Sequence, residues 1–170
     1  LLKKTGTCMA HCPAITSKRG RFAQMGKIYQ AGIPVALGTD WVSMDPWDNM
    51  RFAIGLTRVT TKSIPSHSAQ KALEMATIKG AQILGMADQL GSLTPGKKAD
   101  LIMVDLEKPH FAPFTDRYDL ITTLVYNASG GDVDTVIVDG KVVVQAGRVM
   151  TVSEREVLRD ARRSAEALWK

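Results

Sequence analysis

The 170-residue sequence contains little cysteine, little histidine and few aromatic residues, and these shortages exclude several kinds of protein. Its two cysteines, Cys8 and Cys12, lack the CxxC spacing of a redox pair, and no further cysteines complete a zinc cluster. We therefore expect two free thiols in a reduced cytoplasm. No signal peptide is visible, and no apolar run reaches the ~18 residues that span a membrane, so we expect a cytoplasmic protein without membrane attachment.

The sequence also lacks a phosphate-binding glycine loop and the GxSxG elbow of serine hydrolases. Its net charge of +5 and pI of about 9.3 raise the possibility of nucleic-acid binding. The lysines and arginines are spread along the chain, however, and an aromatic content of 6% is too low for a base-stacking surface. We therefore expect no nucleic-acid partner and keep a nucleic-acid-binding module only as the third candidate function.

Apolar residues make up 45% of the sequence, which is enough to form a core, and they follow two different patterns along the chain. Up to about Leu90, short apolar runs alternate with helical patterns, which is typical of βα units and a parallel sheet. Short β-rich runs with turn signals follow. We therefore predict an α/β protein with three sections, at residues 1–90, 91–150 and 151–170, the last of which is a helix.

Local signals place the expected elements of the first section. The predicted elements are strands at residues 7–11 and 33–38 and helices at about 20–30, from Pro46 onward and at 68–84. Asp45 or Ser43 is expected to cap the helix that begins at Pro46.

The second and third sections have stronger β and turn signals. The predicted elements are strands at residues 99–105, 122–126, 136–138 and 141–144 and a terminal helix after 153–156. Asp139-Gly140 predicts a two-residue hairpin, because both central positions of such a turn need positive φ. Residues 153–156, Ser-Glu-Arg-Glu, form a capping-box sequence for the terminal helix.

Asp40 is the foremost candidate for chemistry, because it directly follows an apolar strand and precedes a helix. In α/β barrels that location is the catalytic face, where a carboxylate can bind a divalent metal or move protons; the alternative is a cap for the next turn. His11 also ends a strand, as either a hydrogen-bonded core residue or a substrate contact. Trp41 is expected to hold a flat substrate at a pocket mouth, Trp47 to pack on its helix, and His67 to lie on the surface.

Five motifs stand in an order that resembles one known family. They occupy residues 10–13 (AHCP), 32–40 (GIPVALGTD), 72–81 (ALEMATIKGA), 90–102 (LGSLTPGKKADLI) and 136–141 (VIVDGK). Together they resemble the amidohydrolase superfamily, in the branch that contains chlorohydrolases, s-triazine hydrolases and nucleoside or cytosine deaminases. The resemblance covers nearly the whole chain.

The resemblance implies the C-terminal part of a (β/α)₈ TIM-type barrel, with residues 7–11 and 33–39 as strands seven and eight, plus part of a small β-sandwich and the terminal helix. Asp40 matches the family's strand-eight aspartate, which binds one divalent metal, zinc or iron, and shuttles the proton of the attacking water. The implied function is hydrolysis of carbon–nitrogen bonds other than peptide bonds, or of C–Cl bonds, in a cyclic, nitrogen-rich small molecule. Asp40 would be catalytic and a metal ligand, with Trp41 and His11 as substrate contacts.

The departures from the family concern the metal site and the pocket. The family's His-x-His of strand one and the histidines of strands five and six have no counterpart, so we predict a fragment that is inactive alone. We expect it to associate with the missing N-terminal part or to form a homo-oligomer. Residues 14–16 replace the family's usual Ser-Asn, and Trp41 replaces a small residue. The alternative is a non-catalytic scaffold of the same fold, which the retained Asp40 disfavours.

Overall fold

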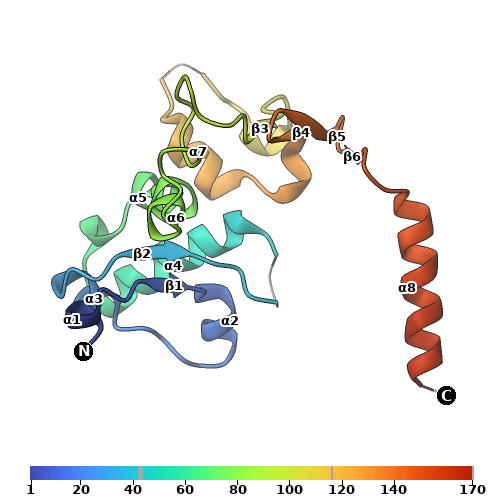
Figure 1. Cartoon of the computed structure of the whole chain (residues 1–170). Coiled ribbons are helices and arrows are strands. Elements are labelled where there is room, and N and C mark those ends of the chain that lie inside the picture. Colours follow the sequence, from blue (N-terminus) through green and yellow to red (C-terminus); the bar gives the residue numbers. More distant parts are fainter. Residues whose placement is uncertain (42–43, 116, 170) are drawn as a thin grey trace. The chain divides into compact units, whose positions relative to one another are not determined.

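The structure is a computed structural model of the chain (Figure 1). It describes residues 1–41, 44–115 and 117–169, apart from the side chain of Ser66. Contacts divide the chain into two units, Leu1–Lys97 with Leu106–Gly130, and Lys98–Asp105 with Gly131–Lys170. Residues 106–130 therefore belong with the first unit, and our three-section boundaries at 90 and 150 stay predictions. In the described parts of the chain, no helix is long and apolar enough to cross a membrane.

Two short parallel strands form the sheet of the first unit (Figure 1). Strand β1 (Met9–His11) pairs with β2 (Val35–Leu37), and His11 lies opposite Leu37. Both strands fall inside the segments predicted from the apolar runs. Because the pairing is parallel, the residues that follow both strands lie at the same edge of the sheet.

The connection between these strands differs from the prediction. A helix expected over residues 20–30 begins only at Met25 (α3, Met25–Gln30), and a further helix, α2 (Pro13–Lys18), precedes it. Pro13 suits the first turn of α2, and Gly20 follows that helix with φ of 66°, a conformation that ends a helix and favours glycine. A short helix, α1 (Leu2–Thr5), lies before β1.

The long helix α4 (Pro46–Thr61) follows β2 and is capped as the sequence predicts. The Asp45 carboxylate accepts a hydrogen bond from the Trp47 N–H at 2.8 Å, and its other oxygen accepts one from the Gly130 N–H at 3.1 Å. Ser43, the other predicted cap, lies outside the described residues. The buried side chains of α4 share one stripe: Trp47, Asn49, Met50, Ala53, Ile54 and Thr57.

The helix predicted over residues 68–84 is broken in two. Helix α5 (Ala69–Ala76) ends and α6 (Ile78–Ile83) begins at Thr77, whose ψ of −99° departs from helical geometry. The Thr77 hydroxyl donates to the Leu73 carbonyl at 2.7 Å, which satisfies an acceptor at the end of α5.

The strand predicted at residues 122–126 was wrong, because this segment lies in helix α7 (Leu120–Asn127). Its β-branched residues favour strands, but hydrogen bonds with side chains outside the helix satisfy backbone groups at both of its ends. Asp119 accepts a hydrogen bond from the Thr122 N–H at 3.0 Å. Arg51 of α4 donates to the carbonyls of Val125 and Ala128 at 3.1 and 2.7 Å. Capping and tertiary contacts therefore override the intrinsic β preference.

The second unit holds a four-stranded antiparallel sheet in the order β3-β4-β5-β6. The strands are β3 (Leu101–Val104), β4 (Val133–Val138), β5 (Lys141–Gln145) and β6 (Arg148–Val149). The predicted hairpin is confirmed, since Asp139 and Gly140 join β4 to β5 with φ of 50° and 77°. The terminal helix is α8 (Glu154–Leu168), and the Ser153 hydroxyl accepts from the Glu156 N–H at 3.4 Å. Short 3₁₀ helices occupy Ile64–Ser66, Pro109–Phe111 and Gly130–Asp132.

The core of the first unit lies between the parallel strands and the helices. Met25, Val35 and Met75 form its buried centre. Around them pack the partly buried apolar residues Met9, Ala23, Ile28, Tyr29 and Leu37. Met9, Val35 and Leu37 alternate along the two strands with the alanines at positions 10 and 36, so one face of the sheet packs on the helices.

Gly91 shows why the turn before the second unit requires glycine. Its φ is +86°, and a Cβ there would lie 2.8 Å from Ala81 Cβ and 2.9 Å from Ile78 Cα. Gly96 has a similar φ of +91° but open space around it. We therefore expect Gly91→Ala to lower the free energy of unfolding by about 2–5 kcal/mol and Gly96→Ala by about 1–2 kcal/mol, as measured by urea denaturation. Equal losses in the two variants would contradict the role of close packing at Gly91.

Candidate functional site

The carboxyl edge of the parallel pair brings together the residues that follow β1 and β2. The Gly38 N–H donates to the His11 carbonyl at 2.9 Å and extends the pairing by one step. A Cβ at Gly38 would lie 3.0 Å from Cys12 Sγ, so the two connections touch here. The chain then continues through Thr39 to Asp40.

Asp40 is exposed at this edge, in a turn with φ of 56° that aspartate tolerates better than most residues. Burial, and then the negative charge of Asp40, raise the pKa of the Cys12 thiol, which places the carboxylate within electrostatic reach of the residue after β1. The cap of α4 is Asp45. Trp41 follows Asp40 and is 68% exposed. The structure therefore presents an exposed carboxylate and an exposed aromatic ring where the strands end.

His11 ends the neighbouring strand, but its side chain is only 2% exposed. It lies two residues after Met9 and opposite Leu37, on the sheet face that packs against the helices. Burial lowers the pKa of His11 to about 4, so the imidazole is neutral at physiological pH. The structure thus separates His11 from the exposed Asp40 and Trp41, and its role as a substrate contact stays a prediction.

His67 was predicted on the surface, and that prediction was wrong, because its side chain is 0% exposed. Its ring stacks on Tyr29 with the centroids 5.9 Å apart, and the Tyr29 hydroxyl lies 3.3 Å from His67 Nδ1. Burial, and then the positive charges of Lys71, His11 and Arg58, lower the pKa of His67 to about 4. Local spacing could not reveal this burial, because Tyr29 lies 38 residues away in the sequence.

A complete metal site is not formed by the described residues alone. Within residues 1–41, 44–115 and 117–169, no group of three or more histidine, cysteine, aspartate or glutamate side chains could hold a metal ion. Protein zinc sites use three or four such ligands. By itself, the exposed Asp40 carboxylate could supply one ligand of such a site.

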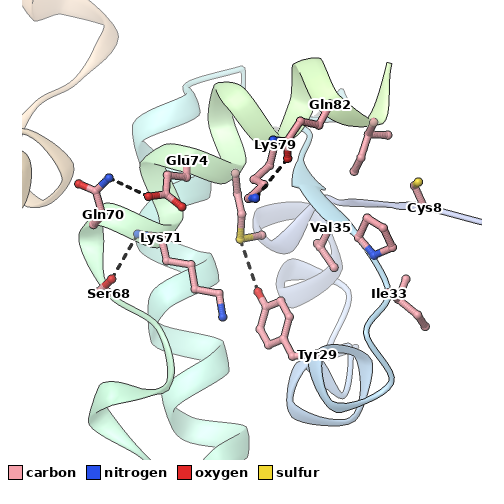
Figure 2. A pocket seen from close by; sticks show the side chains of 13 residues that line it. Cys8, Tyr29, Ile33, Val35, Ser68, Gln70, Lys71, Glu74, Lys79 and Gln82 are labelled. Atoms are coloured by element: carbon pink, nitrogen blue, oxygen red, sulfur yellow. Dashed lines mark hydrogen bonds between the residues drawn. The ribbon is translucent and has the colours of Figure 1, made fainter. Parts of the chain in front are cut away.

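A cavity of about 720 Å³ opens at the opposite, amino-terminal edge of the strands (Figure 2). Cys8 before β1 and Val35 at the start of β2 contribute to its wall, together with Tyr29 of α3. Lys71 lies over the Tyr29 ring at 3.8 Å from its centroid, and the Tyr29 hydroxyl donates to Met75 Sδ at 3.4 Å. Burial raises the pKa of Tyr29 to about 12. In α/β folds ligands bind outside the carboxyl ends of the parallel strands, so the Asp40 edge, and not this cavity, is the candidate functional site.

The model of the amidohydrolase family matches residues 1–143. The chain belongs to the amidohydrolase family. The family resemblance of its five motifs is therefore confirmed.

Relatives of this amidohydrolase include named deaminases. A 5-methylthioadenosine/S-adenosylhomocysteine deaminase from Syntrophomonas wolfei is 41% identical over 165 residues, which cover 94% of this chain and 38% of the relative. A 5′-deoxyadenosine deaminase from Methanosarcina mazei is 37% identical over 173 residues, which cover 99% of this chain and 39% of the relative. The chain thus spans less than half the length of the curated relatives it matches.

Solved structures share the fold of this amidohydrolase. An adenosine deaminase from Xanthomonas campestris with bound zinc superposes with a TM-score of 0.87 at 26% identity, over 96% of this chain and 38% of that one. A zinc complex of atrazine chlorohydrolase from Arthrobacter aurescens superposes with a TM-score of 0.79 at 24% identity, over 93% of this chain and 36% of that one. These relatives are amidohydrolase TIM-barrel proteins, in agreement with the predicted α/β class.

Proposed function

We propose that this amidohydrolase chain is the C-terminal part of a metal-dependent deaminase that hydrolyses the exocyclic carbon–nitrogen bond of an adenosine-type nucleoside. The observation that carries the proposal is the exposed Asp40 carboxylate at the carboxyl edge of the parallel strands. The relatives at 37–41% identity, whose names specify 5′-modified adenosines or S-adenosylhomocysteine, support this substrate class. The complete active site then includes polypeptide beyond these 170 residues.

The proposal assigns β1 and β2 to strands seven and eight of the barrel. It divides the chain into a barrel section at residues 1–90, a β-sandwich section at 91–150 and the terminal helix at 151–170. The parallel register of β1 and β2 and the antiparallel sheet of the second unit support this division. The missing strands and metal ligands would come from the N-terminal part of the protein.

Asp40 would hold one divalent metal, zinc or iron, together with ligands from that part. When bound, the metal supplies Lewis-acid chemistry, lowering the pKa of water toward neutrality. The Asp40 carboxylate accepts a proton from the attacking water and delivers it to the departing nitrogen. One C–O bond forms at the ring carbon, the C–N bond breaks, and ammonia leaves. Its exposed position in a turn, free of the α4 cap, leaves the Asp40 carboxylate available for both tasks.

Trp41 is proposed to border the substrate, since its exposed ring follows Asp40 directly. A flat purine can stack on such a ring. The buried His11 is the weaker candidate for direct contact with the substrate, because its ring lies on the core face of the sheet.

Two rival functions have less support. The similarity to a chlorohydrolase is at 24% identity and shows the fold alone. A non-catalytic scaffold would not need an exposed carboxylate at the end of β2, where nothing in the packing of the described residues requires it.

The test uses the complete enzyme that contains this chain, purified with its metal. We expect release of ammonia from 5′-methylthioadenosine, S-adenosylhomocysteine or 5′-deoxyadenosine, and no release of chloride from atrazine. Metal analysis should find about one zinc or iron per chain. Chloride release without ammonia release would favour the chlorohydrolase, and a protein with neither metal nor activity would favour the scaffold.

A further inference from the structure

Three buried polar atoms in the first unit have no hydrogen-bond partner among the residues that the structure describes. They are His11 Nε2, Thr57 Oγ1 and His67 Nε2. All three residues are at most 2% exposed. An unpartnered buried polar atom costs about 1–3 kcal/mol, so three of them in one small core call for a physical explanation.

Helix α4, which carries Thr57, contacts the 3₁₀ helix before His67 and helix α5 after it. The His11 ring lies on the sheet face that packs against the helices. His67 lies within electrostatic reach of His11, because a proton on His11 would lower the pKa of His67. Arg58, the neighbour of Thr57 in α4, donates from Nε to the His67 carbonyl at 3.1 Å and holds residue 67 against that turn of α4. His67 Nδ1 faces the Tyr29 hydroxyl, so Nε2 on the other side of the ring is the atom left without a partner.

We propose that His11, Thr57 and His67 bind one internal water molecule that joins the end of β1 to the helices packed on it. A buried water makes two to four hydrogen bonds, which matches three unpartnered atoms. Because the Tyr29 hydroxyl donates to Met75 Sδ, His67 Nδ1 donates to that hydroxyl and His67 Nε2 is an acceptor. His11 Nε2 can be a donor or an acceptor, and the threonine hydroxyl can act as both. A metal ion would need further histidine, cysteine or carboxylate ligands, and the described residues form no such group of three.

This water also connects the core to the candidate site. The His11 carbonyl accepts the hydrogen bond of the Gly38 N–H at 2.9 Å, and Asp40 follows two residues later. A hydrogen bond from the water to the His11 ring therefore fixes the end of β1, to which the segment leading to Asp40 is hydrogen-bonded. His11 is thus a positioning residue rather than a substrate contact, a role that rests on the proposed function.

The water site is tested by NMR on the full chain labelled with ¹⁵N-histidine. The chain has three histidines, and the exposed His110 serves as the reference. Thr57→Val removes the hydroxyl and keeps the side-chain shape, whereas Thr57→Ser keeps the hydroxyl. We expect Thr57→Val to shift the Nε2 resonances of both His11 and His67 but not those of His110, and Thr57→Ser to keep the wild-type values. A Thr57→Val spectrum in which either buried histidine is unmoved overturns the proposal.

A measurement on the unaltered chain covers the case in which Thr57→Val does not fold. Nuclear Overhauser effects between water and the ring protons of both His11 and His67 are expected. Their absence for either ring overturns the shared water site.

The positioning role is tested on the complete enzyme. We expect Thr57→Val to weaken zinc binding roughly tenfold, with KM changed by less than about twofold, and Thr57→Ser to restore the affinity. Wild-type zinc affinity in Thr57→Val overturns the positioning role. A wild-type enzyme without deaminase activity would refute the proposed function, whereas the NMR result would still decide the water site.

Discussion

Replacing Asp40 with asparagine in the complete enzyme is expected to lower kcat for deamination by about 10²–10⁴-fold, the usual contribution of a positioned proton-transfer group. The reason is that the substitution removes the only proposed proton acceptor at the carboxyl edge and weakens a metal ligand. Asparagine tolerates the φ of 56° at this position, so the turn itself should survive. Asp40→Asn therefore separates the loss of charge from a loss of backbone geometry, which Asp40→Ala would combine.

The measurement pairs steady-state kinetics with metal analysis of the purified variant. Asp88→Asn is the matched control, because Asp88 is an exposed aspartate in the turn after α6. We expect the control to keep the metal and the activity, and Asp40→Asn to lose most of both. Full metal content together with unchanged kcat in Asp40→Asn would remove Asp40 from the catalytic site.

The features that the sequence predicts correctly are those with short-range causes. The Asp139-Gly140 hairpin follows from two adjacent residues that adopt positive φ, and the Asp45 cap from one side chain beside Pro46. The strand that leads to Asp40 is recognisable because both of its faces are apolar. The location of Asp40 at a strand end therefore follows from local sequence, although its catalytic role does not.

The features that the sequence misses depend on distant partners. Helix α7 is held at its C-terminal end by Arg51, 74 residues from Val125. The burial of His67 depends on Tyr29, and the break at Thr77 depends on one residue whose backbone angles no pattern specifies. Such contacts exist only after the chain has folded, so periodicity and propensity alone cannot report them.

The two buried histidines lead to the second prediction of large effect, a loss of stability in mild acid. In the unfolded chain the pKa of each is near 6.5, whereas burial lowers both to about 4 in the fold. Below pH 6.5 the unfolded state therefore binds more protons than the folded state, and stability falls as the pH falls. Because each pH unit is worth 1.36 kcal/mol per group, the loss approaches roughly 3 kcal/mol for each histidine by pH 4.

A combined loss of about 7 kcal/mol at most is comparable with the whole stability of a typical domain, so we expect the chain to unfold between pH 6.5 and 4. The urea concentration at the unfolding midpoint should fall steeply as the pH is lowered from 6.5 to 4. The double variant His11→Gln/His67→Gln should show a weaker dependence of this midpoint on pH. His110→Gln is the matched control and should leave the slope unchanged, since His110 is exposed. The carboxylate of Asp119, whose pKa is lowered from 3.8 by its hydrogen bonds to Thr122, contributes only at lower pH. A steep slope that persists in the double variant would assign the acid sensitivity to other groups and would mean that the two imidazoles are not held neutral by the core.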